Sequence, residues 1–196
     1  MRKIIPDDAV LVPDGAELKF KGMIFDVYQW PQKLFDGSEH TFEMLKRTDT
    51  VNALCVVEDR VVVLNDEQPH LGKRLSFPGG RVDDSDESQL SAVQREVREE
   101  TGYSFKKWRL VWVWQPYRKI EWFNYIFIAW DINGQDKPHL DPGEKIELKQ
   151  LSFEEVKDLS LKQEGYIGNV WPLLEHLNDL DDLLALPEFQ GREVER

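Results

Sequence analysis

One long helical pattern constrains the fold of this chain more than any other part of its sequence. Within residues 87–101, Leu90, Val93 and Val97 stand at positions i, i+3 and i+7, which share one side of an α-helix. Charged residues occupy most of the remaining circumference, and Gly102 follows as a residue suited to end the helix. A helix with a single apolar stripe must bury that stripe, so we expect residues 87–101 to pack against a sheet.

Short runs of β-forming residues predict that sheet. They occupy residues 18–30, 41–47, 51–57, 60–64, 109–114, 122–132 and 146–151. The stretch 65–80 is rich in Pro and Gly and is predicted to be a loop. Ser152 and Glu155 have the spacing of a capping box that opens a helix, and a last helix is expected over 168–186. Because hairpins and helices do not alternate as in a doubly wound fold, this order predicts an α/β/α sandwich with a mixed sheet.

The charge and apolar content of the chain limit its partners and its location. Lys and Arg total 25 against 37 Asp and Glu, and the net charge of −12 argues against a general affinity for nucleic acid or anionic membrane. A phosphorylated substrate would therefore need a metal ion. No apolar run reaches the roughly 18 residues of a membrane span, and no signal peptide is recognisable, so we expect a cytoplasmic protein. Cys55 is the single cysteine, lies in an apolar run and is expected in the core.

Three carboxylates are expected on one face of the predicted helix. Glu96, Glu99 and Glu100 stand at i, i+3 and i+4, and each like-charged pair at that spacing costs about 0.2 to 0.5 kcal/mol. A divalent cation such as Mg²⁺ would turn this repulsion into ligation, because it prefers carboxylate oxygens. The alternative is a solvated helix face on which Arg95 and Arg98 neutralise their neighbours.

Gly79 and Gly80, upstream of the helix, favour a site, because glycines let a backbone carbonyl approach a metal or a phosphate. Loop and helix together resemble the signature of the Nudix hydrolase family, which is Gly, five residues, Glu, seven residues, Arg-Glu, an aliphatic, any residue, Glu-Glu, any residue, Gly and a hydrophobic residue. The chain matches it from Glu87 to Tyr103. Six residues separate Gly80 from Glu87 instead of five, so either the loop is one residue longer or Asp86 takes the place of the first Glu.

The resemblance implies an α/β/α sandwich that uses Mg²⁺ or Mn²⁺ to hydrolyse a nucleoside diphosphate joined to a group X. Bound metal would neutralise charge on the diphosphate and lower the pKa of an attacking water. In this chain the implied metal ligands are the Gly79 carbonyl, Glu96, Glu99 and Glu100. Gly80 is expected to contact the substrate, and Arg95, Glu96 and Glu99 are expected to take part in catalysis, with Arg95 orienting a carboxylate.

The layout outside this signature resembles the ADP-ribose pyrophosphatase branch of the family. In that branch an amino-terminal β extension exchanges between the subunits of a dimer and supplies an aromatic residue that stacks on adenine. The resemblance implies a homodimer in which residues 1–47 form the extension and 48–196 the Nudix domain. Phe42 stands where the stacking aromatic would fall, and the alternative is that it belongs to the hairpin core. Tyr28 and Trp30 are weaker candidates.

The same branch places a glutamate on a loop late in the chain, where it acts as a base or orients water. Glu144 corresponds to it here, whereas Glu147 falls in the strand that follows; the alternative for Glu144 is an exposed loop carboxylate. One departure concerns phosphate binding. The branch commonly has an arginine after the second core strand, and this chain has Asn65, Asp66 and Glu67 there, which leaves ADP-ribose itself open as the substrate.

The sequence thus favours a metal-dependent hydrolase of a small nucleoside diphosphate derivative, with ADP-ribose or another nucleotide sugar as the expected substrate. The alternative is a Nudix-fold binding or sensor module that does not hydrolyse its ligand. The three helix glutamates and the two loop glycines are all present, and a module without catalysis has no need of a destabilising acidic cluster.

Overall fold

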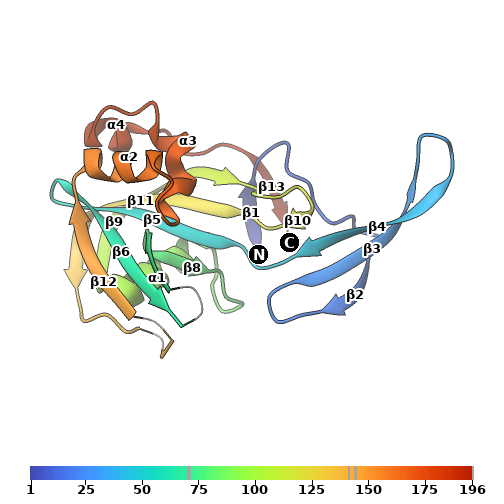
Figure 1. The fold of residues 1–196 in the computed structure, drawn as a ribbon, viewed down its shortest axis with the longest axis horizontal. Helices are drawn as coiled ribbons and strands as arrows, with labels where there is room; N and C mark the ends of the chain where they lie inside the picture. The colour runs from blue at the N-terminus through green and yellow to red at the C-terminus, as the bar shows by residue number, and fades with distance from the viewer. Residues whose placement is uncertain (70–71, 141, 144, 196) are drawn as a thin grey trace.

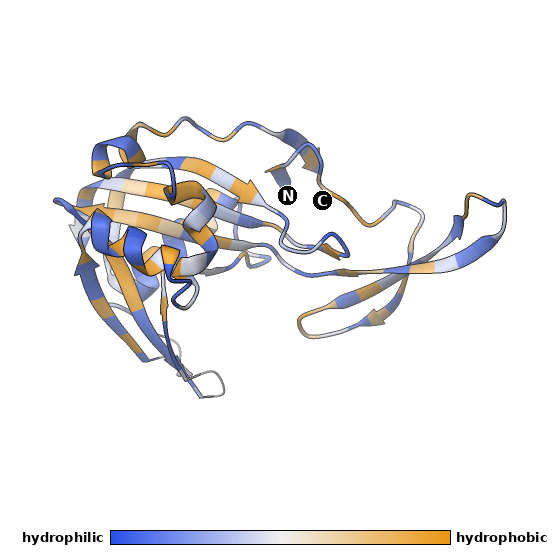
Figure 2. Cartoon of the chain, turned by 45° about the horizontal axis from the view of Figure 1, so that its top comes forward, coloured by the Kyte–Doolittle hydropathy of each residue, from blue (hydrophilic) through white to orange (hydrophobic). Residues whose placement is uncertain are grey.

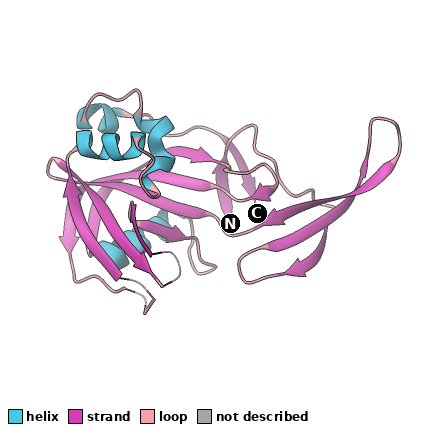
Figure 3. Cartoon of the chain, viewed as in Figure 1, coloured by secondary structure: helices cyan, strands magenta, loops and turns pink. Residues whose placement is uncertain are grey.

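The computed structural model describes residues 1–69, 72–140, 142–143 and 145–195. A central sheet lies between two helical layers (Figures 1 and 3). Helix α1 (Gln89–Thr101) covers one face, and α2 (Phe153–Leu161), α3 (Trp171–Leu174) and α4 (Leu180–Ala185) cover the other. No helix among the described residues has the length and apolar content needed to span a membrane.

The central sheet is mixed. Its strands run in the order β12-β6-β5-β11-β9, with β7 paired to β6 and β8 paired to β5. β11 is parallel to β5 and antiparallel to β9. These strands are β5 (Thr50–Val57), β6 (Arg60–Gln68), β7 (Gly72–Ser76), β8 (Gly79–Arg81), β9 (Tyr103–Trp114), β11 (Asn124–Gln135) and β12 (Lys145–Leu151). The predicted fold class, an α/β/α sandwich with a mixed sheet, is confirmed.

The residues of β5 alternate between the two cores of the sandwich. Val51, Ala53 and Cys55 are buried on the α1 side, whereas Leu54 and Val56 are buried on the α2 side. Figure 2 shows the hydrophobic residues concentrated along these strands. Cys55 therefore belongs to the core, as the sequence predicts.

The apolar stripe of α1 differs from the expected one by one residue. Val93 and Val97 are fully buried, but Leu90 is 39% exposed, and Ala92 is buried instead. The buried face of the helix begins at Gln89 and continues through Ala92, Val93 and Val97, so Leu90 lies beside this face. The small Ala92 side chain allows the helix to lie close to β5.

An extension projects from one side of the sandwich (Figure 1). It consists of β2 (Glu17–Lys21), β3 (Asp26–Lys33) and β4 (Glu39–Lys46), which pair in antiparallel order, and the short β10 (Ile120–Glu121) pairs with β4 in parallel. The predicted amino-terminal hairpin is thus present, and 18–30 forms two strands. The β10 contact attaches the extension to the sandwich.

Two predicted segments are wrong in detail. The stretch 65–80 is not a loop, because it contains the end of β6 and both β7 and β8. The single helix expected over 168–186 is instead a 3₁₀ turn (Ile167–Val170) followed by α3 and α4. Asp179 interrupts it, since its extended backbone and its side chain, which accepts a hydrogen bond from the Asp182 N–H, start a new helix.

The sequence analysis also missed the pairing of the two ends of the chain. β1 (Arg2–Ile5) and β13 (Arg192–Glu195) form an antiparallel pair beside the sandwich. Lys3 of β1 makes a buried ion pair of 2.8 Å with Asp49, which joins this pair of strands to the start of β5.

Candidate active site

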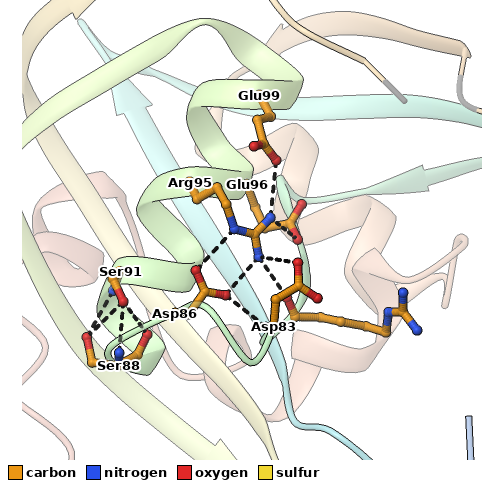
Figure 4. A network of polar contacts seen from close by, with 8 residues as sticks. Asp83, Asp86, Ser88, Ser91, Arg95, Glu96 and Glu99 are labelled. Atoms are coloured by element: carbon orange, nitrogen blue, oxygen red, sulfur yellow. Dashed lines mark hydrogen bonds and ion pairs between the residues drawn. The ribbon is translucent and has the colours of Figure 1, made fainter. Parts of the chain in front are cut away.

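The first turn of α1 is fixed by a capping box. The Ser88 hydroxyl accepts a hydrogen bond from the Ser91 N–H, and the Ser91 hydroxyl accepts one from the Ser88 N–H (Figure 4). At the other end Gly102 takes the left-handed conformation that ends the helix, with φ of 75°. The helix therefore holds all three signature glutamates between two defined ends.

Arg95 is the centre of a polar network in front of this helix (Figure 4). Its guanidinium donates to both carboxylate oxygens of Asp86, at 3.1 and 2.9 Å. It also donates to Glu96 at 2.9 Å and to Glu99 at 3.1 Å, and to the backbone carbonyl of Arg81 at 3.1 Å. Hydrogen bonding to Asp86 raises the pKa of Arg95, and the same bonds lower the pKa of Asp86.

The hydrogen bonds of Arg95 show which acidic residue takes the place of the first Glu of the signature. Asp86, which follows Gly80 after five residues, forms the bidentate pair with Arg95. Glu87 is exposed and has no hydrogen bond or ion pair within the described ranges of the chain. Of the two alternatives that the sequence left open, Asp86 therefore takes the position of the first Glu.

The two loop glycines make different close contacts. Gly79 has a φ of 151°, and a Cβ atom there would lie 2.1 Å from the Val51 carbonyl oxygen of the neighbouring strand. A Cβ atom on Gly80 would instead lie 2.5 Å from Oε1 of Glu96. Gly79 thus lets β8 pair closely with β5, and Gly80 leaves space for a carboxylate of α1.

The glutamates of α1 have different surroundings. Glu96 is largely buried, and this loss of solvation raises its pKa to about 7 despite the nearby Arg95. Glu100 is 9% exposed, and its Oε2 accepts a hydrogen bond of 2.7 Å from the Gly79 N–H. Glu99 is the most exposed of the three. The structure thus brings Glu96 and Glu100 against the glycine loop and leaves Glu99 at its rim.

The structure places a glycine loop against the acidic face of one helix. A comparison of the whole sequence with models of protein families agrees with this arrangement. The family model of the NUDIX domain matches residues 46–170, which is more than half of the chain. This chain belongs to the Nudix family. The prediction of a Nudix hydrolase is thereby confirmed at the level of the family.

One solved structure supports the fold, and a second is reported with it. A crystal structure of an ADP compounds hydrolase is similar with a TM-score of 0.61 and 18% sequence identity, covering 80% of this chain and 84% of that one. A structure from a study of MutT from Aliivibrio salmonicida and Vibrio cholerae has a TM-score of 0.49 and 15% identity, covering 66% and 94%. No curated protein sequence matches significantly.

The Nudix glutamates offer suitable donors for a divalent cation, although they are not drawn together around one point. Across the described residues, no three His, Cys, Asp or Glu side chains form a ready metal cluster. Arg95 instead bridges Glu96 and Glu99, using one oxygen of each. Their hard carboxylate oxygens, beside a loop whose Gly80 leaves space where a Cβ would stand, fit Mg²⁺ or Mn²⁺.

The predicted substrate-binding residue Phe42 does not lie beside the Nudix helix. Phe42 lies on β4 of the extension, is 42% exposed and packs near Trp30, with ring centroids 6.3 Å apart. Glu144 lies outside the described residues. Glu147 is in β12, as expected, and accepts a hydrogen bond of 3.1 Å from the side chain of Asn65.

The sequence analysis missed an arginine and a tyrosine near this part of the Nudix domain. Arg74 on β7 forms an ion pair of 3.3 Å with Asp66, the middle residue of the Asn65, Asp66 and Glu67 segment where the branch commonly has an arginine. Its guanidinium also donates to the Tyr166 hydroxyl at 2.8 Å. The available signal in the sequence is Asp66, an acid in the segment where the branch commonly has an arginine, because the stretch that forms β7 is predicted to be a loop.

Proposed function

We propose that this Nudix protein is a divalent-metal-dependent hydrolase that cleaves the diphosphate of a nucleoside diphosphate derivative, with ADP-ribose or another nucleotide sugar as substrate. The observation that supports this best is the close packing of Gly80 against the Glu96 carboxylate, which is only 17% exposed although it is charged when ionised. Burying a carboxylate that ionises near neutral pH is costly, and a cation beside it offsets that cost.

The residues that would hold Mg²⁺ or Mn²⁺ are Glu96, Glu99, Glu100 and the carbonyl of Gly79. Bound there, the metal supplies charge neutralisation for the diphosphate and acidifies a water. Arg95 occupies one oxygen of Glu96 and one of Glu99, which leaves the second oxygen of each for other ligands. Asp86 fixes the guanidinium in turn, so that Arg95 orients both carboxylates. We assign the activation of water to Glu144, the residue that precedes β12 in the sequence.

We also propose that residues 1–47 carry the dimer contacts of the enzyme and that Phe42 contacts the substrate of the partner subunit. The extension exposes large apolar side chains, and among the residues that the structure describes its strand β2 pairs with β3 alone. The exposed residues are Leu18, Phe20, Met23, Ile24, Phe35 and Phe42. Apolar side chains and an open strand edge are features that a second subunit would cover.

Hydrolysis assays test this proposal directly. The purified chain is incubated with ADP-ribose, other nucleotide sugars, dinucleotides and nucleoside triphosphates, with Mg²⁺ or with excess EDTA. We expect Mg²⁺-dependent cleavage of at least one nucleotide sugar. Glu99→Gln should lower that turnover by about 100-fold or more, since it removes a ligand of the metal that would neutralise transition-state charge, and loss of such stabilisation costs about 10² to 10³ in rate.

Glu87→Gln is the matched control, because Glu87 is an exposed carboxylate of the same segment that makes no hydrogen bond or ion pair with the described residues. It should keep the wild-type rate. Full activity in EDTA, or wild-type rates for Glu99→Gln, would exclude the proposed metal site. A chain that binds nucleotide sugars and cleaves none of them would be the non-hydrolytic module.

A further inference from the structure

One row of side chains crosses the central sheet on the face that the helices α2, α3 and α4 cover further along. Thr50 is paired with Arg81 of β8 on one side and with Asn124 of β11 on the other, and Asn124 is paired in turn with Trp114 of β9. Residues paired across neighbouring strands point to the same face of a sheet. Val51, the neighbour of Thr50, is buried on the α1 side, so the row lies on the opposite face.

The row begins at the glycines of the proposed metal site. Arg81 directly follows Gly80, and Gly79 is paired with Asn52, two residues along β5 from Thr50. Among the described residues β8 pairs with β5 alone, so β8 is an edge of the sheet at this point. The edge carries no side chain at Gly79, and a diphosphate bound at its carbonyl can pass over it. Adjacent strands lie about 4.8 Å apart, so two strand spacings leave room for a ribose between the diphosphate and β11.

Asn124 is the member of this row whose presence the fold does not explain. Its side chain is 7% exposed, and its Nδ2 is buried without a hydrogen-bond partner among the residues that the structure describes. A buried amide donor without a partner destabilises the folded state. The neighbouring Thr50 is already engaged, because its hydroxyl accepts from Nε1 of Trp122 at 3.0 Å. The Asn124 amide is therefore available to an acceptor atom of a ligand.

The aromatic residues beside the row favour a flat ligand. Trp114 is stacked on Trp112, with ring centroids 4.3 Å apart and an angle of 16° between the rings, which fixes its orientation. Trp122 is held at Thr50, and the Arg47 guanidinium lies 4.5 Å from its ring centroid. All three indoles are partly exposed. A nucleobase has a flat face that stacks on aromatic rings, and it has ring nitrogens or carbonyl oxygens that accept hydrogen bonds.

We propose that this row binds the nucleobase of the substrate and that the Asn124 amide donates to an acceptor atom of the base. The inference rests on the proposed function and deepens it, because it assigns the part of the nucleoside diphosphate derivative that distinguishes one nucleotide from another. Asn124 is thus a residue that determines base specificity.

The binding of nucleoside diphosphates tests this inference without hydrolysis. ADP, GDP, CDP and UDP, each with Mg²⁺, are titrated by calorimetry into the full chain, and pyrophosphate with Mg²⁺ is the ligand without a base. Asn124→Leu should weaken the binding of the tightest nucleoside diphosphate by about three- to tenfold, the range of one hydrogen bond, and leave pyrophosphate binding unchanged. The same variant should raise the melting temperature by about 2 °C or more, because it removes a buried amide without a partner.

Two further variants support the comparison. Asn124→Ala removes the same amide without requiring space for leucine and should show the same loss of affinity for the nucleoside diphosphate. Asn133→Leu is the matched control, because Asn133 is an exposed asparagine near the other end of β11, and it should leave every affinity unchanged. A loss of affinity in a variant that melts no lower than the wild type is a change that a purely structural role of Asn124 would not produce.

Three results would overturn the inference: an equal loss for pyrophosphate, unchanged affinity for every nucleoside diphosphate in both Asn124 variants, or wild-type binding of nucleoside diphosphates no tighter than that of pyrophosphate. If the wild type hydrolyses no nucleoside diphosphate derivative, the proposed function fails, while these affinities still decide the role of Asn124.

Discussion

Gly80 lies directly against the carboxylate of Glu96, since a Cβ atom on Gly80 would stand 2.5 Å from Oε1 and 2.6 Å from Cδ of that side chain. The adjacent Gly79 has its close contact with the backbone of Val51 instead. Gly80 therefore leaves space for the Glu96 carboxylate, whereas Gly79 allows β8 to pair with β5.

Alanine substitutions should separate these two roles. In Gly80→Ala the end of the flexible Glu96 side chain can move, so we expect a melting temperature near that of the wild type and at least about tenfold lower Mg²⁺-dependent turnover. Gly79→Ala meets fixed backbone at a φ that alanine rarely adopts, and should lower the unfolding free energy by about 2 kcal/mol or more. Thermal melts and rates of both variants check this. Wild-type turnover in Gly80→Ala would show that the position of Glu96 does not matter.

The pairing of Asp86 with Arg95 should make stability depend on pH in the acidic range. The Arg95 hydrogen bonds lower the pKa of Asp86 in the folded state below its ordinary value of 3.8. The resulting stabilisation is fully present well above pH 3.8 and is lost as pH falls through the lowered pKa. Asp86→Asn should therefore cost about 1 to 2 kcal/mol at pH 7, and the difference from wild type should shrink below about pH 4. Urea unfolding at a series of pH values measures both.

Glu87→Gln provides the comparison for Asp86→Asn. Glu87 is exposed and does not contact Arg95, so its loss should change the urea midpoint little at any pH. If Glu87→Gln destabilises the protein more than Asp86→Asn does, then Glu87 and not Asp86 takes the position of the first Glu of the Nudix signature in solution.

Glu144 and Glu147 should differ in their effect on turnover. A general base or a water-orienting group typically contributes about 10² to 10⁴ in rate, so Glu144→Gln should lower kcat by at least about tenfold with substrate affinity nearly unchanged. Glu147 is held in β12 with its side chain toward Asn65, and Glu147→Gln should have a small effect. Steady-state kinetics in Mg²⁺ decides this. If Glu147→Gln lowers kcat and Glu144→Gln does not, the base is Glu147, three residues further along the chain.

The extension should mediate dimerisation. Light scattering at micromolar concentration should give about twice the chain mass of 23.0 kDa. Replacing Phe20 and Met23 with Lys should shift the protein toward the monomer, because charge on an apolar interface must be desolvated. Leu161→Lys, at an apolar position of α2 that is 56% exposed, should leave the mass unchanged. A wild-type mass near 23 kDa would contradict the dimer.

Local patterns in the sequence were enough to predict the elements whose hydrogen bonds join residues only a few positions apart. The 3.6-residue period places Val93, Val97 and the glutamates of α1 on their correct sides, because the helix is determined by neighbours three and four positions away. The capping box of Ser152 and Glu155 opens α2 as predicted, since both of its hydrogen bonds are local. The Nudix signature is readable for the same reason, as most of it lies on one helix.

Contacts between distant segments were decided only by the tertiary structure. β7 and β8 have no strong strand signal and form because β6 and β5 offer partners, while β1 finds β13 at the other end of the chain. The choice of Asp86 over Glu87 depends on which carboxylate reaches Arg95 across the loop. The stacking of Arg74 on Tyr166 joins residues 92 positions apart, a separation at which no periodicity in the sequence carries information.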